Sequence, residues 1–316
     1  MQKLLLLTDF YGDEDEPLDG KNAWLCKQLL SQVGVDYGSC DTLSVINRRV
    51  PNEYALRANK AGGLPGVWQK PHHVSKAYAE DVSLTETIIK KRAPNCILAL
   101  GSLPTWFLLG SGAVKSVRGA LTATRVGIKA IVTHSMQDVF RDWTLRPIVL
   151  SDMHKAGREA KYPEIIRPAR HVHIRPTLAD LATFEESYIN DAPLLSIDIE
   201  TTGDRITCIG FAPSTNLAIV IPFHSAEGSY WPSLAEELEA WNYVRRWCLK
   251  PALFQNGLYD IQFLWRRYGI QIPNAVEDTM LLHHAMQPEM NKGLGFLGSL
   301  YTDEASWKFM RKAKHD

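Results

Sequence analysis

Short apolar runs alternate with longer amphipathic stretches through the first half of the chain. Uninterrupted apolar runs predict strands, and apolar residues that recur every three or four positions predict helices. The predicted strands lie at residues 3–10, 42–49, 95–101 and 128–134. The predicted helices lie at residues 20–33, 76–92 and 146–160. Another helix is predicted directly after Ser102, which we expect to be its N-cap. In the first of these helices Trp24, Leu25, Leu29 and Val33 are expected on one side.

This alternation of strands and helices predicts a parallel sheet covered on both faces. Ligands of such sheets bind at the carboxyl ends of the strands. Here those ends fall near Asp9, Asn47, Gly101 and His134.

The pattern changes around residues 163–193, where prolines and basic residues interrupt it. We therefore predict two domains, 1–168 and 169–316. In the second, strands are predicted at 194–201, 205–213, 217–223 and 252–255, and helices at 233–248 and 257–268. Three successive strands, then a helix and a strand, are typical of a ribonuclease-H-like mixed sheet.

Composition narrows the class of protein. The chain has 316 residues, of which 45% are hydrophobic, so it can bury a core in each of two domains. Lys plus Arg equals Asp plus Glu, at 35 each, so bulk charge does not indicate a nucleic-acid partner. A basic surface would have to be local, for instance at residues 90–92, 245–246 or 266–267, although most such groups are solvated helix ends.

The five cysteines are scattered and show no C-x-x-C spacing, so we expect no disulfide framework and no iron–sulfur cluster. No signal peptide and no apolar segment of membrane-spanning length is seen. These features predict a soluble protein of the cytoplasm with no membrane partner.

Two acids stand in the strand predicted from "LLSIDIETTGD", residues 194–204. Side chains alternate faces along a strand, so Asp198 and Glu200 project together while Ile197 and Ile199 face the other way. Paired carboxylates repel unless a cation lies between them, and oxygen ligands favour Mg²⁺ or Mn²⁺. An acid-x-acid pair is common by chance, but the apolar strand before it and the Thr-Thr-Gly turn after it single this one out.

A second element follows in "LFQNGLYDIQFL", residues 253–264. Asn256 and Asp260 are four apart, so we expect them on one helical face, with Leu258, Ile261 and Leu264 toward the core. We expect Asp198, Glu200 and Asp260 to converge within one coordination sphere. A third carboxylate makes a two-metal phosphodiesterase plausible.

The segments "SIDIETTG", "FQNGLYDIQFL" and "VEDTMLLHHA" resemble motifs of the DEDD 3′–5′ exonucleases, most of all the proofreading domain of family A DNA polymerases. The resemblance implies a two-metal site with Mg²⁺ or Mn²⁺ on Asp198, Glu200 and Asp260 as catalytic and metal-binding residues. It also implies single-stranded DNA 3′ ends as substrate, with Thr201 and Asn256 as DNA contacts. Asp278 matches a position that the family uses mainly for structure.

The third motif of that family, Tyr-x-x-x-Asp, has no match. Tyr301 is followed four residues later by Ala305, and the chain ends at Asp316. "LGSLYTDEASWK" resembles the segment just upstream of that motif in phage-type polymerases. We therefore expect at most weak exonuclease activity from this chain, restored by a downstream polymerase polypeptide.

The first domain resembles the uracil-DNA glycosylase superfamily in "LLTDFYGDEDE", "INRRVPN", "APNCILALGSLPTWFLLG" and "IVTHSMQDVFRDWTLRPIVLSDMHKA". The resemblance implies a parallel α/β/α sandwich that binds DNA and reads a flipped uracil in a pocket. The positions that match the pocket are Gly12, Asp15, Ser44, Asn47 and His134. Because the functional residues of the family are altered there, we expect uracil excision to be very slow or absent.

Three interpretations follow. The leading one is the N-terminal portion of a phage-type DNA polymerase, with a glycosylase-like domain joined to a proofreading exonuclease. The second is a repair enzyme that excises uracil. The third is a non-catalytic clamp that presents DNA to a polymerase on another chain.

Overall fold

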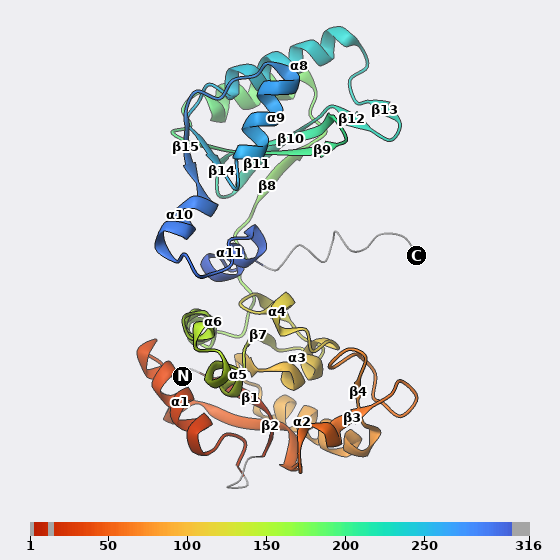
Figure 1. Ribbon diagram of the computed structural model, residues 1–316, viewed down its shortest axis with the longest axis vertical. Coiled ribbons are helices and arrows are strands. Elements are labelled where there is room, and N and C mark those ends of the chain that lie inside the picture. Colours follow the sequence, from red (N-terminus) through yellow and green to blue (C-terminus); the bar gives the residue numbers. More distant parts are fainter. Residues whose placement is uncertain (1–2, 12–15, 305–316) are drawn as a thin grey trace. The chain divides into compact units, whose positions relative to one another are not determined.

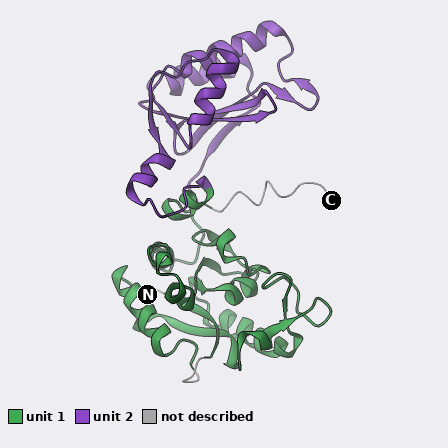
Figure 2. Ribbon diagram, in the orientation of Figure 1, with its two compact units in different colours: residues 1–166, 295–316 green, residues 167–294 purple. Residues whose placement is uncertain are grey.

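The computed structural model describes residues 3–11 and 16–304. The chain is a mixed α/β protein of two compact units, coloured separately in Figure 2. The first unit comprises residues 1–166 and 295–316, and the second comprises residues 167–294. We had expected residues 169–316 to form one domain. The structure instead groups the segment from Gly295 onward with the first unit.

The first unit is built on a five-stranded sheet with the strand order β2-β1-β5-β7-β6. Figure 1 labels β1, β2 and β7 of this sheet. The strands of this unit are β1 (Leu4–Tyr11), β2 (Asp41–Arg49), β3 (Arg57–Ala58), β4 (His73–Val74), β5 (Cys96–Leu100), β6 (Leu121–Ala123) and β7 (Lys129–Thr133). Its helices are α1 (Gly20–Gln32), α2 (Ala79–Arg92), α3 (Ser102–Leu109), α4 (Val114–Val117), α5 (Met136–Arg141), α6 (Arg146–Glu159) and α11 (Leu294–Tyr301). Strands β2, β1, β5 and β7 are parallel, and β6 is antiparallel to β7.

The run of four leucines in β1 is explained by burial on both faces of this sheet. Leu4 and Leu6 pack in a core cluster with residues of α1, α5 and α6, whereas Leu5 and Leu7 pack in another cluster with residues of α2 and α3. A parallel strand covered on both faces needs apolar side chains at every position. The predicted parallel sheet with helices on both faces is therefore confirmed.

Two local predictions in this unit are wrong. Trp24 was expected on one side of α1 together with Leu25 and Leu29, but it is 58% exposed whereas both leucines are buried. Ser102 was expected as the N-cap of α3 but is its first helical residue, and the cap is Gly101 at φ 103°. A side chain is rarely tolerated at that φ, which explains the glycine.

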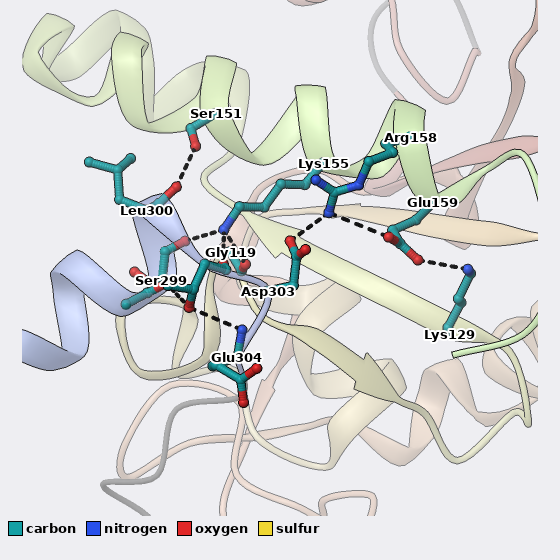
Figure 3. A network of polar contacts seen from close by, with 12 residues as sticks. Gly119, Lys129, Ser151, Lys155, Arg158, Glu159, Ser299, Leu300, Asp303 and Glu304 are labelled. Carbon is teal, nitrogen blue, oxygen red and sulfur yellow. Dashed lines mark hydrogen bonds and ion pairs between the residues drawn. The ribbon is translucent and has the colours of Figure 1, made fainter. Parts of the chain in front are cut away.

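The segment after Gly295 is fastened to α6 by a buried cation (Figure 3). The Lys155 Nζ donates hydrogen bonds to the backbone carbonyls of Gly119 (3.1 Å), Ser299 (2.6 Å) and Thr302 (2.6 Å). Burial lowers the pKa of Lys155, and nearby Asp152 works against this effect. Three carbonyl acceptors satisfy all three donors of an ammonium group.

A second buried cation supports the same segment. Arg118 donates to both oxygens of Asp152, at 3.0 and 2.6 Å, and to the Ser299 Oγ at 2.9 Å. Both members of this ion pair are almost fully buried. Bidentate pairs of this kind are among the stronger hydrogen-bonded contacts in proteins. The segment is therefore an integral part of the first unit.

The second unit is built on a six-stranded mixed sheet with the order β15-β14-β9-β10-β11-β8. The strands of this unit are β8 (His171–Ile174), β9 (Leu195–Thr202), β10 (Arg205–Ser214), β11 (Leu217–Pro222), β12 (His224–Ser225), β13 (Gly228–Ser229), β14 (Ala252–Phe254) and β15 (Ala275–Asp278). Its helices are α7 (Leu178–Phe184), α8 (Leu234–Trp247), α9 (Leu258–Tyr268) and α10 (Thr279–Met286). Pairing is antiparallel between β9 and β10 and between β10 and β11, and parallel elsewhere in the sheet.

Numbered by appearance from β9, the main strands of this sheet lie in the order 5-4-1-2-3, with β8 added beside the third. This order is consistent with the ribonuclease-H-like fold that we expected. One core cluster contains the inward side chains of β9 with residues of α7, α8 and α9. Trp247 of α8 belongs to this cluster and lies edge-on to Phe211, with ring centroids 5.1 Å apart.

No helix in residues 3–11 and 16–304 is long and apolar enough to cross a membrane.

Candidate functional site

The outward face of β9 presents the two carboxylates. Ile197 and Ile199 are buried in the core of the second unit, and Asp198 and Glu200 between and beyond them are exposed. The alternation expected from the sequence is therefore present. It places both acids on the same face of the sheet.

The neighbouring strand leaves room beside these acids. In β10, Gly210 lies opposite Asp198, and Cys208 lies opposite Glu200. Residues directly opposite each other in an antiparallel pair share a face. Burial raises the pKa of the Cys208 thiol, and the charges of Glu200 and Asp198 add to the rise. A glycine and the small side chain of a cysteine thus adjoin the carboxylates on the outer face.

Asp260 lies in the first turn of α9 and is buried, at 5% exposure. Its Oδ1 accepts a hydrogen bond of 3.1 Å from the backbone N–H of Ile199, the residue between the two acids of β9. Burial raises the pKa of Asp260 to about 6; the Ile199 hydrogen bond opposes the rise, and the charge of Asp198 adds to it. The third carboxyl group is therefore held against the strand that carries the other two.

The three acids do not form a ready-made coordination sphere. Among residues 3–11 and 16–304, no group of three or more His, Cys, Asp or Glu side chains is arranged to hold a metal ion. Asp260 accepts a hydrogen bond from the Ile199 N–H, and like charges repel, so the convergence of the three acids on one metal ion stays a prediction. The donor set itself, three carboxylates with two of them exposed, fits Mg²⁺ or Mn²⁺ in its chemistry.

Asp278 shapes the chain around this site. Its Oδ1 accepts from the N–H groups of Asn256 (3.1 Å), Met280 (2.8 Å) and Leu281 (3.4 Å), and its Oδ2 accepts from Gly257 N–H at 2.8 Å. Although partial burial acts in the opposite direction, these donors lower the pKa of Asp278. The carboxylate thus caps α10 and fixes the turn that leads into α9, a structural role.

Asn256 does not lie on the helical face where we expected it. It lies in the turn before α9 with φ 61°, so the i, i+4 relation to Asp260 does not apply. The turn is tight because Gly257 lies against the Phe254 side chain, where a Cβ would come within 2.4 Å of the Phe254 Cβ. Asn256 is exposed beside the site, and the proposed contact of this residue with DNA stays a prediction.

Thr201, the other expected DNA contact, lies near the end of β9. Its Oγ1 is hydrogen-bonded to the Tyr259 hydroxyl of α9 at 2.7 Å. This bond ties the end of the strand to the first turn of the helix. Leu258 in the same turn, which we expected in the core, is 67% exposed. Ile261 and Leu264 do pack against the core, as predicted.

Asp303, an acid close in sequence to the missing third motif, already has a hydrogen-bond partner. Asp303 accepts a hydrogen bond of 2.5 Å from Arg158 in the first unit (Figure 3). Tyr301 ends α11, also in the first unit, and Ala305 lies outside the described residues.

The expected pocket of the first unit is described in part, because Gly12 and Asp15 lie outside the described residues. Ser44 is fully buried, and its hydroxyl is hydrogen-bonded to that of Thr8 at 2.9 Å. Asn47 donates from Nδ2 to the Thr85 Oγ1 of α2 at 2.6 Å. Both side chains therefore hold neighbouring elements together.

His134 follows β7 and is buried, at 7% exposure. Burial lowers its pKa, with the charge of Asp138 acting against this. The imidazole is therefore held mainly neutral at pH 7.

Asp9 is a candidate that the sequence located only as a strand end. Burial raises its pKa to about 7, and the charges of Glu53 and Asp138 add to the rise. Its Oδ1 is buried without a hydrogen-bond partner among the described residues. Gly101 lies beside it, since a Cβ there would come within 3.6 Å of that oxygen. An acid at the carboxyl end of the first strand was the available signal.

Comparisons with known proteins give matches among solved structures alone. No family model matches this chain, and no curated protein matches it. The solved structures include NrnC of Brucella melitensis with bound Mg²⁺, at 19% identity over 42% of this chain and 59% of that chain, with a TM-score of 0.27. They also include the EXD2 exonuclease domain soaked in Mn and GMP, at 15% identity over 41% and 68%, with a TM-score of 0.28.

A third match is the Nibbler EXO domain of Aedes aegypti, at 13% identity over 48% of this chain and 77% of that chain, with a TM-score of 0.35. This chain spans 59% of the length of the NrnC structure.

Proposed function

We propose that the second unit is a metal-dependent nuclease that removes nucleotides from the 3′ end of single-stranded DNA. The observation that carries the proposal is the hydrogen bond from Ile199 N–H to Asp260, which holds a buried carboxyl beside the two exposed ones of β9. The resemblance of the three segments to DEDD exonucleases supports the direction of cleavage and the choice of DNA.

Asp198, Glu200 and Asp260 would hold Mg²⁺ or Mn²⁺. When bound, such ions lower the pKa of a water molecule and neutralise charge on the phosphate. The part of the chain is to supply three carboxylates. Two of them are exposed, and exposed side chains change rotamer readily. The third must lose a proton whose pKa is about 6 before it can serve as a ligand.

We infer that the reaction is slow. The described residues bring three carboxylates to this place, and two further acids, Asp278 and Asp303, are engaged by backbone N–H groups and by Arg158. Loss of one acid–base or orienting group typically costs about 10²–10⁴ in rate. A polymerase polypeptide that supplies the missing group, in cis or in trans, would restore the rate.

For the first unit we propose a glycosylase-like DNA-binding role with little or no uracil excision. The observation in its favour is that Asp9 and His134 lie at the carboxyl ends of parallel strands, where ligands of such sheets bind. Release of uracil from DNA by the whole chain, lost on His134→Ala, would establish the repair enzyme instead.

The nuclease is tested by following degradation of a 3′-labelled single strand in Mn²⁺. We expect slow release of labelled mononucleotides, abolished by Asp198→Ala. Asp204→Ala is the matched control, because this exposed acid lies in the turn after the same strand. Release that is equal in the Asp198→Ala and Asp204→Ala proteins would refute the proposal.

A further inference from the structure

Five side chains of α9 form a stripe on its outer side. The spacing i, i+3, i+4, i+7 and i+8 places them along one face of the helix. They line a surface hollow of about 410 Å³, which we call the α9 groove. They are Tyr259, Gln262, Phe263, Arg266 and Arg267. A helix usually turns a stripe with this spacing toward a core, but here the stripe faces a hollow. We call the rings of Tyr259 and Phe263 its aromatic half and the guanidinium groups of Arg266 and Arg267 its cationic half.

The aromatic half of the groove has a firm backing. Tyr259 is 51% exposed, and the centroid of its ring lies 5.8 Å from that of Phe263. Phe263 in turn stacks on Tyr268 at 6.4 Å, and Tyr268 stacks on Trp241 of α8 at 4.5 Å. An exposed ring supported by a row of packed rings is a platform on which a nucleobase can stack.

The cationic half has no ionic partner among the residues that the structure describes. Arg266 and Arg267 are exposed, and within residues 3–11 and 16–304 neither makes an ion pair or a side-chain hydrogen bond. Arg246, in the last turn of α8, is by contrast bound to both oxygens of Glu185 at 3.1 Å. Cations favour the end of any helix, but two unpaired ones beside exposed rings match the charge and shape of a single strand.

One end of the α9 groove lies beside the part of β9 that carries the carboxylates. Its first residue, Tyr259, is hydrogen-bonded to Thr201, which directly follows Glu200. From Tyr259 to Arg266 the helix rises about 10 Å, at about 1.5 Å per residue. A single strand of nucleic acid whose end lies at Asp198 and Glu200 can therefore continue over the exposed ring of Tyr259 to Arg266.

We propose that the α9 groove binds the single-stranded DNA next to the 3′ end that the carboxylates attack. The rings of Tyr259 and Phe263 stack on bases, and Arg266 and Arg267 neutralise phosphates. This inference rests on the proposed function for the identity of the strand and for its direction.

Binding is measured on the whole chain by fluorescence anisotropy of a labelled oligothymidylate in EDTA, which prevents hydrolysis, across a series of salt concentrations. Each phosphate contact to a single strand contributes about 0.7 to the slope of log K against log salt. The double variant Arg266→Ala/Arg267→Ala should therefore lower the magnitude of that slope by about 1.4. Arg245→Ala/Arg246→Ala is the control, since it removes the same charge from the last turn of α8.

The aromatic half is tested with two variants of one residue. Loss of stacking on one base typically weakens binding by about tenfold. We expect that loss in Tyr259→Ala, whereas Tyr259→Phe, which keeps the ring and loses the Thr201 bond, should bind like wild type. Equal salt slopes for the two arginine pairs, equal binding of Tyr259→Ala and wild type, or tighter binding of RNA or duplex DNA would each overturn the inference. Since no hydrolysis occurs, these results stand apart from the Asp198→Ala test.

Discussion

Asp260 differs from Asp198 and Glu200 in how deeply its carboxyl group is buried. The two acids of β9 are exposed, whereas Asp260 is buried and has a pKa raised to about 6. Near pH 6, about half of the Asp260 side chains still carry a proton. A metal ligand must be deprotonated, so proton and metal compete for this residue.

The nuclease rate should therefore rise with pH through about 6 when Mn²⁺ is limiting. Below that pH the protonated form of Asp260 predominates and metal is held more weakly. At higher Mn²⁺ the midpoint should move to lower pH, because the metal displaces the proton. The measurement is the initial rate across pH at two Mn²⁺ concentrations. If the midpoint did not change with the Mn²⁺ concentration, the loss of rate at low pH would come from a group other than Asp260.

At the scale of elements, the site depends on the turn between β14 and α9. This turn holds Asn256 in the left-handed region and is tied to β15 and α10 by Asp278. The four N–H groups that Asp278 accepts from belong to the turn and to the first turn of α10. One side chain thus sets where α9, and therefore Asp260, begins.

Asp278→Ala should lower the free energy of unfolding of the second unit by about 2–3 kcal/mol, since hydrogen bonds to a charged group and a helix cap are lost together. Amide hydrogen exchange at Gly257 and Met280 should accelerate most. Asp180→Ala, which removes the exposed capping box of α7, is the control and should cost about 1 kcal/mol. Unchanged exchange at Gly257 would show that the turn holds without Asp278.

Most of the elements that the sequence predicted have bounds within two residues of those observed, because their patterns are local. Strand β9, for instance, was expected at 194–201 and spans Leu195–Thr202. The sequence missed β8 and β15, which are short and largely exposed; each is a strand through its pairing to another strand.

The same distinction applies to the candidate site, where some features follow from local sequence patterns and others from tertiary contacts. Asp198 and Glu200 follow from alternation along one strand, and Asp260 was found by its position in a helix. Its hydrogen bond to Ile199 and the burial of Asp9 depend on tertiary placement, which no local pattern encodes.

At the scale of the whole molecule, the chain leaves the first unit near residue 166 and returns to it at Gly295. Lys155 holds the returning segment by its carbonyls, and Arg118 holds it by Ser299. The second unit is therefore an insertion between two parts of the first, joined to it at both ends.

Lys155→Met should release the returning segment, because three carbonyls lose a buried donor. A cost of about 1.4 kcal/mol corresponds to tenfold in the population of the released form, and we expect at least that increase in the rate of chymotryptic cleavage between residues 295 and 304. Arg158→Ala, which removes a half-exposed ion pair with Asp303, is the control and should change the rate little. Equal rates in the two variants would contradict this role of Lys155.

The central claim is that three carboxylates of the second unit hold a divalent metal. The most direct measurement is Mn²⁺ binding to the whole chain, followed by the electron paramagnetic resonance of the free ion. Asp198→Asn, Glu200→Gln and Asp260→Asn should each weaken binding by about tenfold or more, since each removes a charged ligand. Asp204→Asn, an exposed acid next to the same strand, should bind Mn²⁺ like wild type. Equal Mn²⁺ affinity in all four variants would contradict the account.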